Sequence, residues 1–516
     1  MNDSSSTPPI RWWPAIVILG VGAAVAGIAR LWSSLDFQIR NVVVLVVIAV
    51  ALPMLTTWWL LFSRAPWRMR LTVFALVLAL GGAFSAVYEW HGVTGNFVPI
   101  FEPRWRSHAA PASPQAEPGA TSAESGRPDF PQYLGRERNG VIGDGPALAR
   151  DWQKEPPQVL WRQPIGTAWS GFAIVGNRAV TLEQRGEQET VTCLDVLTGK
   201  QLWTYGYAAL FEGAYSGDGP RATPTIADGR VYTLGATGVV SCLRLDTGAL
   251  VWQRDLYKDA GGGRPEWGYA GSPLVLDGKV IVSAGKARRR SLFAYSVADG
   301  SIVWRDGSQP GNYSSPCLLN LAGVPQIVMF NTINITAHDP KTGAVLWEYP
   351  WGRRQPQIAQ PVPVGPNRVA FSSGYGVGTE LLEIKKDDAD KMSAQRVWKT
   401  LKFRVKMSSF IYRDGYFYGL DDGILACIDA RDGSPQWKEG RYGHGQILFI
   451  DDLLLVTAEN GEIVLLAPTP EASNELTRFR VFSGKTWNPP ALSGDLLLMR
   501  TDQEVACLRL PLVRQP

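Results

Sequence analysis

The stretch CLDVLTGKQLW, residues 193–203, combines an apolar run, a Thr-Gly turn and a tryptophan placed four residues after the glycine. The same pattern returns as CLRLDTGALVW at residues 242–252. Apolar and β-branched runs that end at such a turn are typical of β-strands joined in a hairpin. The glycine and tryptophan keep this offset in five places: Gly199/Trp203, Gly248/Trp252, Gly300/Trp304, Gly343/Trp347 and Gly433/Trp437. The chain therefore carries an internal repeat.

Three further aromatic positions extend the repeat to eight units. The anchors are spaced 39 to 52 residues apart, at Trp161, Trp203, Trp252, Trp304, Trp347, Trp398, Trp437 and Phe479. A period of this length indicates a solenoid or a propeller. Residues 224–252 hold four short apolar runs separated by Asp-Gly and Thr-Gly turns, which leaves no room for a helix. Four strands per unit is the content of a propeller blade.

The two ends of the repeat region complement each other. The last unit, residues 479–512, supplies three strands, whereas the stretch QVLWRQ at 158–163 is a strand that precedes the first complete unit. If this strand completes the last unit, the ring closes without an exposed strand edge. We therefore expect residues 129–516 to form an all-β domain, an eight-bladed β-propeller of four-stranded antiparallel blades.

The first ninety residues predict a membrane domain. Three long apolar runs lie there, and about 20 apolar residues are enough for a helix to cross a bilayer. We expect transmembrane helices at about 12–32, 42–63 and 71–90 within a membrane domain at 1–90, followed by a linker rich in Pro, Ala and Ser at 91–128. The loop SRAPWRMR (63–70) has three arginines and no acid, which favours the cytoplasmic side. The prediction is a multi-pass inner-membrane protein with a periplasmic propeller.

Composition excludes several functional classes. A net charge of +4 over 516 residues gives no electrostatic signal for nucleic acid. The five cysteines contain no Cys-x-x-Cys pair, which argues against a disulfide scaffold and a structural zinc site. Cys193, Cys242 and Cys427 each lie six residues before a turn glycine, where Ala294 and Ala337 stand in other units. These cysteines are interpreted as packing residues, and no metal site is predicted.

The repeat formula, a strand with Cys or Ala, an Asp, a Thr-Gly or Asp-Gly turn and a Trp, resembles the tryptophan-docking repeat of pyrroloquinoline quinone (PQQ) dehydrogenases. It also resembles BamB, the propeller lipoprotein of the outer-membrane β-barrel assembly machine, which shares the fold without the quinone. The resemblance covers residues 129–512. For an enzyme it implies PQQ stacked at the mouth of the axis, Ca²⁺ held by Glu, Asn and Asp, and an Asp as base. The adjacent cysteines common in the alcohol dehydrogenases are missing here.

The start of each inner strand is where a ligand at the axis would bind. One residue per unit stands just before the proline position, namely Gly171, Thr223, Ser272, Ser315, Gln360, Ser409, Gln446 and Asn488. Two residues earlier, on the same strand face, lie Trp169, Arg221, Ala270, Tyr313, Ile358, Met407, His444 and Thr486. One interpretation is that small polar residues simply fill a crowded, wet channel.

The other interpretation is an axial binding site made by Trp169, Arg221, Tyr313, His444 and Asn488. Arg221 suits a carboxylate, and Trp169 and Tyr313 offer flat faces. Neither set contains an acid, which counts against Ca²⁺ and against a carboxylate base. Glu266 lies in the Gly-rich insertion KDAGGGRPEWGYAGSP (258–273), either a lid over the channel or an ordinary surface loop, and is the candidate catalytic residue of a dehydrogenase.

Two functions remain open at this point. The favoured one is a binding module, tethered to the inner membrane, for envelope protein assembly or ligand sensing; it needs no cofactor and is not an enzyme. The alternative is a membrane-bound dehydrogenase that uses PQQ with Ca²⁺ to oxidise an alcohol or sugar and passes the electrons to quinone. The short units and the missing acids favour binding.

Overall fold

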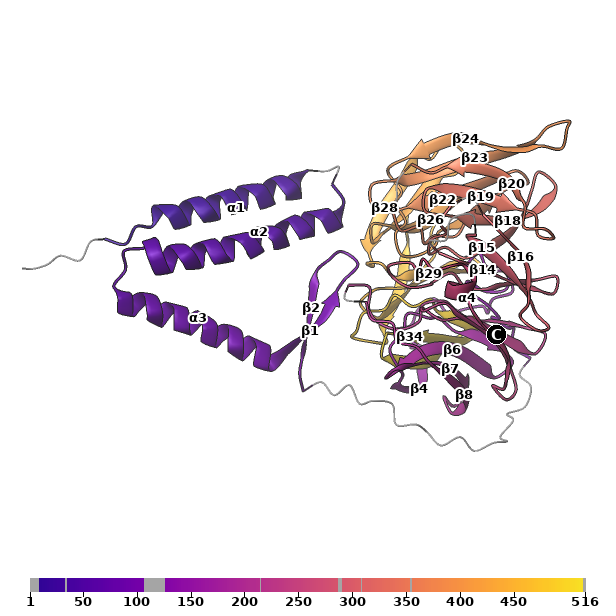
Figure 1. Cartoon of the computed structure of the whole chain (residues 1–516), viewed down its shortest axis with the longest axis horizontal. Coiled ribbons are helices and arrows are strands. Elements are labelled where there is room, and N and C mark those ends of the chain that lie inside the picture. Colours follow the sequence, from indigo (N-terminus) through magenta and orange to yellow (C-terminus); the bar gives the residue numbers. More distant parts are fainter. Residues whose placement is uncertain are drawn as a thin grey trace, which may run out of the picture. The chain divides into compact units, whose positions relative to one another are not determined.

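A computed structural model describes residues 9–32, 35–105, 126–213, 215–285, 290–307, 309–352 and 355–513. The chain separates into two compact units, residues 1–107 and residues 108–516. The first is mainly helical and the second is mainly β (Figure 1).

The first unit contains three long helices. They are α1 (Trp13–Leu31), α2 (Phe37–Thr57), which continues as the π-helix η1 (Trp58–Phe62), and α3 (Trp67–Val87). With mean hydropathies of 2.0, 2.3 and 1.9, all three are long and apolar enough to cross a membrane. The three predicted helices are therefore confirmed as helices of that kind, with α2 and α3 each starting several residues earlier than expected.

An arginine stabilises each connection between these helices. Arg40 donates from Nε to Leu35 O (3.1 Å) and from Nη2 to Trp32 O (3.0 Å). Arg70 donates from Nη1 to Leu60 O (2.7 Å) and from Nε to Ala65 O (2.8 Å). The carbonyls at a helix end have no partner inside the helix, so these guanidinium groups satisfy main-chain acceptors that lipid could not.

The predicted linker at 91–128 begins too early. Residues 88–103 form a hairpin of β1 (Tyr88–Val93) and β2 (Pro99–Pro103), and β1 follows α3 without a break (Figure 1). The strands are short and form a two-stranded sheet, so their sequence signal is weak. Most of the rest of the predicted linker, residues 106–125, lies outside the described residues.

The described part of the second unit contains eight antiparallel sheets. The first four are β5 (Ala173–Val175), β6 (Arg178–Arg185), β7 (Gln188–Asp195) and β8 (Gln201–Ala208); β9 (Thr225–Ala227), β10 (Arg230–Leu234), β11 (Val239–Arg244) and β12 (Leu250–Asp255); β13 (Leu274–Leu276), β14 (Lys279–Ser283), β15 (Leu292–Ser296) and β16 (Ile302–Asp306); and β17 (Cys317–Leu321), β18 (Val324–Phe330), β19 (Asn334–His338) and β20 (Val345–Pro350). A short helix, α4 (Leu256–Asp259), follows β12.

The other four sheets continue the pattern. They are β21 (Val362–Val364), β22 (Arg368–Ser373), β23 (Gly378–Lys386) and β24 (Met392–Thr400); β25 (Ile411–Arg413), β26 (Tyr416–Asp421), β27 (Ile424–Asp429) and β28 (Pro435–Arg441); β29 (Gln446–Ile450), β30 (Leu453–Thr457), β31 (Glu462–Leu466) and β32 (Glu475–Arg480), with β3 (Val141–Ile142) added in parallel to β29; and β33 (Ala491–Ser493), β34 (Leu496–Arg500) and β35 (Glu504–Arg509) with β4 (Gln158–Pro164).

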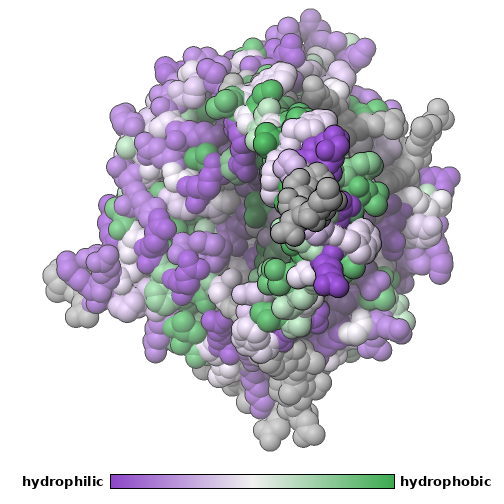
Figure 2. Space-filling view, turned by 90° about the vertical axis from the view of Figure 1, so that its left-hand side faces the viewer, coloured by the Kyte–Doolittle hydropathy of each residue, from purple (hydrophilic) through white to green (hydrophobic). Residues whose placement is uncertain are grey.

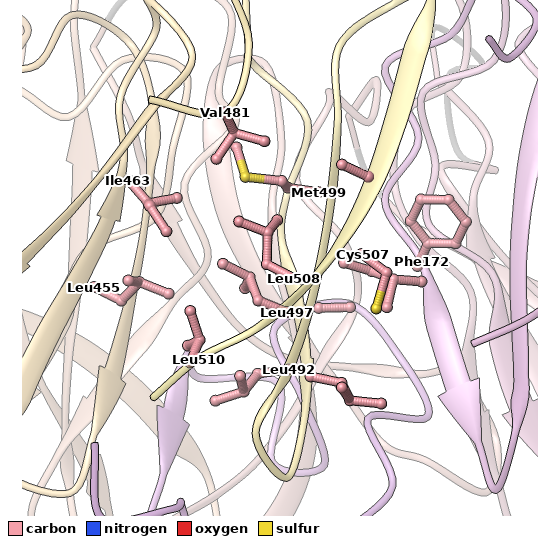
Figure 3. Close-up of a cluster of buried hydrophobic side chains, with 14 of the residues drawn as sticks. Phe172, Leu455, Ile463, Val481, Leu492, Leu497, Met499, Cys507, Leu508 and Leu510 are labelled. Atoms are coloured by element: carbon pink, nitrogen blue, oxygen red, sulfur yellow. The ribbon is translucent and has the colours of Figure 1, made fainter. Parts of the chain in front are cut away.

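The last sheet joins the two ends of the repeat region. β4 pairs antiparallel with β35, with Trp161 opposite Cys507, as predicted for residues 158–163. One hydrophobic cluster contains Phe172, directly before β5 of the first sheet, together with Leu455 and Leu497 of the last two sheets (Figure 3). Because the last sheet packs on the first, residues more than 300 positions apart share one core.

The glycine–tryptophan repeat docks one sheet on the next at five junctions. Gly248 has a positive φ of 71°, and a Cβ on it would lie 2.5 Å from the ring of Trp203 in the preceding sheet. The indole of Trp203 also donates to Leu245 O (2.9 Å). Four other glycines contact a tryptophan of the preceding sheet in this way: Gly199, Gly300, Gly343 and Gly433. Only glycine allows both this backbone conformation and this close approach.

The cysteines are packing residues. All five are buried and free, and Cys507 lies among Leu497, Leu508 and Phe172 (Figure 3). On the face visible in Figure 2, hydrophilic side chains are frequent and hydrophobic ones lie among them.

Candidate functional site

The eight residues that precede the inner strands form a hydrogen-bonded belt. Its members are Gly171, Thr223, Ser272, Ser315, Gln360, Ser409, Gln446 and Asn488. Gly171 N donates to Thr223 Oγ1 (3.2 Å), and Thr223 N donates to Ser272 Oγ (2.9 Å). Ser272 N then donates to Ser315 Oγ (2.9 Å). Each bond joins one sheet to the next.

Longer side chains complete the belt. With its side-chain amide in the orientation that satisfies both groups, Gln360 donates to Ser315 O and accepts from Ser315 N (3.0 Å each). Gln360 N donates to Ser409 Oγ (3.3 Å). Gln446 Nε2 donates to the carbonyls of Met407 (3.1 Å) and Trp487 (2.9 Å).

Asn488 closes the belt. Its Nδ2 donates to Ala168 O (3.0 Å) and Ser170 O (2.9 Å). The side chains of the belt are at most 4% exposed. They satisfy main-chain groups that would otherwise be buried without partners, which explains the small polar residues at these positions. The predicted site residue Asn488 thus has its Nδ2 committed to the belt.

Trp169 lies in an aromatic and cationic group. Its ring centroid is 4.9 Å from that of Trp487, and Lys485 Nζ lies 4.7 Å from the Trp169 centroid and 4.2 Å from the Trp487 centroid. An ammonium group over an indole face is attracted by the ring quadrupole. Burial lowers the pKa of Lys485, while Asp502 and Glu459 oppose this shift.

Glu459 connects this group to His444. One carboxylate oxygen accepts from Trp487 Nε1 (2.8 Å) and the other from His444 N (3.0 Å). His444 is 1% exposed, and burial together with the charge of Lys406 lowers its pKa to about 4. His444 is therefore neutral at pH 7. Glu459 is an acid beside the inner strands, although neither predicted set of residues contains an acid.

Lys406 is another buried cation at this end of the strands. It is 2% exposed, and its Nζ lies 4.7 Å from the centroid of the Tyr375 ring. Both Lys406 and Lys485 stand three residues before a belt residue, Ser409 and Asn488 respectively. In a strand, residues three positions apart lie on opposite faces, so the sequence analysis did not place these lysines with the belt residues. A comparison of all units at the position three residues before the belt residue could have found them.

Arg221 holds a loop. Its guanidinium donates to the carbonyls of Ser216, Gly217 and Gly219, and its Cζ lies 4.5 Å from the centroid of the Phe211 ring. Gly217 in turn packs against the indole of Trp169. Burial lowers the pKa of Arg221 to about 10. The predicted carboxylate receptor therefore shapes the loop beside Trp169.

Tyr313 pairs with the Gly-rich insertion. Its ring stacks on Trp267 at a centroid distance of 5.2 Å and 22°, and its hydroxyl accepts from Trp267 N (3.2 Å). Burial raises the pKa of Tyr313 to about 12. Tyr313 and Glu266, which is exposed, both line a cavity of about 490 Å³. The other lining residues are Pro265, Gln309, Pro310, Gly311, Asn312, Thr332, Ile333, Gln355 and Pro356.

The predicted site residues thus occupy different positions. Trp169 and His444 are linked through Trp487 and Glu459, Tyr313 lies with Glu266, and Asn488 belongs to the belt.

Sequence comparison assigns the family. Residues 155–257 and 187–439, together more than half of the chain, match the family described as outer membrane protein assembly factor BamB. The chain belongs to this BamB-like family of PQQ-type repeats. It is 29% identical to the quinohemoprotein alcohol dehydrogenase of Comamonas testosteroni over 131 residues, 24% of this chain and 18% of that protein. It is 34% identical to BamB of Xanthomonas campestris pv. campestris over 88 residues, 17% and 21% of the two chains. These matches span about a fifth of either relative.

Solved structures show the same fold. The quinohemoprotein alcohol dehydrogenase from Comamonas testosteroni gives a TM-score of 0.53 at 13% identity and covers 75% of this chain and 82% of its own. A europium-containing methanol dehydrogenase gives 0.56 at 12% identity, over 74% and 98%. At this identity the likeness establishes a propeller-type fold and nothing about chemistry.

As the structure holds them, Trp169 and Arg221 do not fit the quinone of the dehydrogenases. A planar tricarboxylate needs an open aromatic face and available cationic donors. Trp169 already contacts Trp487 and Lys485, and Arg221 donates to three loop carbonyls. Among the described residues, no group of three or more His, Cys, Asp or Glu side chains could hold a metal ion.

Proposed function

We propose that this chain is a multi-pass inner-membrane protein whose eight sheets form one closed, eight-bladed propeller in the periplasm. The propeller acts as a binding module for envelope proteins or a ligand. The membership in the BamB-like family and the three apolar helices support the coarse features of this proposal.

The observation that carries the proposal is that most polar groups around the inner strands bond to one another, although Trp169 Nε1 and Asn488 Oδ1 are buried without such a bond. The side-chain amides of Gln446 and Asn488 donate to main-chain carbonyls. Arg221 donates to carbonyls of the 216–219 loop, and Glu459 accepts from Trp487 and His444. A catalytic site needs groups free to contact the reacting atoms in a defined geometry. A rigid ring with a shaped surface suits recognition.

A PQQ-dependent dehydrogenase is the second candidate. It is favoured by the likeness to proteins named quinohemoprotein alcohol dehydrogenase and methanol dehydrogenase. In that case the 490 Å³ cavity with Glu266 and Tyr313 would receive the substrate, and PQQ would bind with Ca²⁺.

Titration of the full chain with PQQ tests the two candidates. Tryptophan fluorescence and dye reduction with simple alcohols and sugars are measured with and without Ca²⁺. We expect no saturable binding below about 10 μM, a limit equivalent to roughly −7 kcal/mol, and no turnover. Tight, Ca²⁺-dependent binding with turnover that is lost in Glu266→Gln would establish the dehydrogenase instead.

Crosslinking in cells tests the binding module directly. A photoreactive amino acid at position 267, beside the cavity, is expected to give discrete adducts with envelope proteins. The matched control is position 303, because Val303 is an exposed residue of an outer strand, β16. Equal labelling at both positions, or adducts at neither, would contradict recognition at this surface.

A further inference from the structure

The β1–β2 hairpin has two chemically different faces. Trp90 pairs with Phe101 and Tyr88 with Pro103, whereas Glu89 pairs with Glu102. Because residues directly opposite each other share a face and neighbours alternate, Tyr88, Trp90 and Phe101 lie on one face and the two glutamates on the other. Glu89 is exposed and Glu102 is partly exposed, so the acidic face reaches solvent.

The aromatic face continues the exposed surface of α3. Leu76, Leu80 and Phe84 follow one another at intervals of four residues and therefore form one stripe along the helix, and Tyr88 begins β1 directly after it. The ring of Phe84 stacks on Tyr88 at 4.9 Å and meets Phe101 edge-on at 5.1 Å. No residue of α3 is buried. The helical stripe and the aromatic face of the hairpin are thus one continuous apolar surface.

Hydrogen bonds hold the hairpin at the ends of two helices. Arg104 donates from N to Val87 O (2.9 Å) and from Nε to Ser85 O (2.8 Å), at the carboxyl end of α3. Asn41, near the start of α2, donates to Asn96 O in the hairpin turn (2.8 Å). In antiparallel neighbouring helices these two ends lie on the same side of a membrane, so the hairpin is placed there.

Large aromatic side chains remain exposed on this hairpin. Trp90 and Phe101 are both 48% exposed, although a two-stranded sheet needs a partner for its apolar face. Trp and Tyr concentrate at membrane–water interfaces, where their apolar bodies contact lipid and their polar groups reach water.

We propose that the β1–β2 hairpin is an interfacial element, with Tyr88, Trp90 and Phe101 inserted into the lipid headgroup and acyl boundary at the end of α3. The partner is the bilayer itself, because the face is continuous with the lipid-facing stripe of a candidate span. The proposal rests on the membrane assignment of the three helices. It fixes where the membrane ends along the chain and where the propeller tether starts.

Nitroxide labels on the full chain in nanodiscs of phosphatidylcholine and phosphatidylglycerol test this proposal. The labels are attached to Phe101→Cys on the aromatic face and to Glu102→Cys, its neighbour on the acidic face. The native cysteines are all buried, and the unmodified chain gives the blank. Power saturation compares accessibility to O₂, which concentrates in lipid, with accessibility to a water-soluble nickel chelate. We expect O₂ to dominate at position 101 and the nickel chelate at 102.

Two further labels make the outcomes separable. Leu80→Cys reports whether α3 itself contacts lipid, and Trp90→Cys repeats the aromatic-face measurement if the change at 101 disturbs the hairpin. Lipid contact at 80 with water contact at 90 and 101 would overturn the hairpin proposal alone. Water contact at 80 would overturn the membrane assignment with it. Positions 90 and 101 shielded from both reagents would indicate a protein surface over the hairpin and would also overturn the proposal.

Discussion

His444 is a buried histidine surrounded by charged groups. Lys406 and Arg441 disfavour its cationic form, Glu459 and Asp422 favour it, and burial dominates, so its pKa falls from 6.5 to about 4. This residue was predicted to contact a ligand because it stands two residues before the belt residue Gln446, on the same strand face. In the structure its main chain donates to Glu459, and its ring is kept neutral.

The neutral His444 predicts a pH dependence of stability. Below pH 6.5 the unfolded chain takes up a proton that the folded chain does not bind until about pH 4, so the free energy of unfolding falls as the pH drops through this window. The full shift corresponds to about 3 kcal/mol. Urea unfolding of the full chain in detergent at pH 7 and pH 4.5 measures it. His444→Gln should lose less stability between these pH values than the unmodified chain, and an identical loss in both would refute the assignment.

At the scale of the element, the turn glycine is the contact point between consecutive sheets. Gly248 and Gly229 lie in the sheet β9–β12 with nearly equal φ values of 71° and 69°. A Cβ on Gly248 would lie 2.5 Å from Trp203, whereas a Cβ on Gly229 would have nothing within 4 Å. A comparison of substitutions at the two glycines therefore distinguishes the cost of backbone strain from the cost of lost packing between sheets.

Gly248→Ala is expected to destabilise the propeller more than its matched control Gly229→Ala. Both changes place a side chain at positive φ, which costs roughly 1–2 kcal/mol. Only Gly248→Ala also forces the Trp203 ring away, which costs roughly 1–3 kcal/mol more, as in an overpacked core. The midpoints of urea unfolding of the full chain provide the comparison. Equal midpoints would show that the tryptophan does not depend on close contact with the glycine.

At the scale of the whole molecule, the arginines at the junction of η1 and α3 predict the orientation. Arg64 lies in the connection, and Arg68 and Arg70 lie in the first turn of α3; positive charge in short loops and at the ends of spans is retained on the cytoplasmic side. One span, α3, follows this junction, so the residues after α3 are expected on the opposite side of the membrane. The periplasmic location in the proposed function depends on this argument.

Reporter fusions in a Gram-negative host test the orientation. Alkaline phosphatase, which is active only after export, should be active when it is fused after Pro516. The same reporter fused after Ala65 in a shortened chain should be inactive, because that loop is expected in the cytoplasm. The reverse pattern would place the propeller in the cytoplasm and would remove envelope proteins as its partners.

The sequence by itself determined the features that depend on residues close together in the chain. The Gly–Trp offset predicted the turns, and the apolar runs predicted the strands. One long-range pairing, β4 with β35, could also be predicted, because the last unit has three strands and residues 158–163 supply a spare fourth. Composition predicted the three apolar helices. Strand alternation and span length are local properties, so they can be read from a single sequence.

Only the tertiary structure decided what the residues around the inner strands do. Asn488 reaches carbonyls of residues 168 and 170, more than 300 positions away, because the last sheet packs on the first. Lys485, Trp487 and Glu459 meet Trp169 and His444 through loops of different sheets. The β1–β2 hairpin likewise depends on contacts with α2 and α3. Such contacts form between segments that are distant in the chain, and no local pattern encodes them, because the packing of whole sheets and helices brings the segments together.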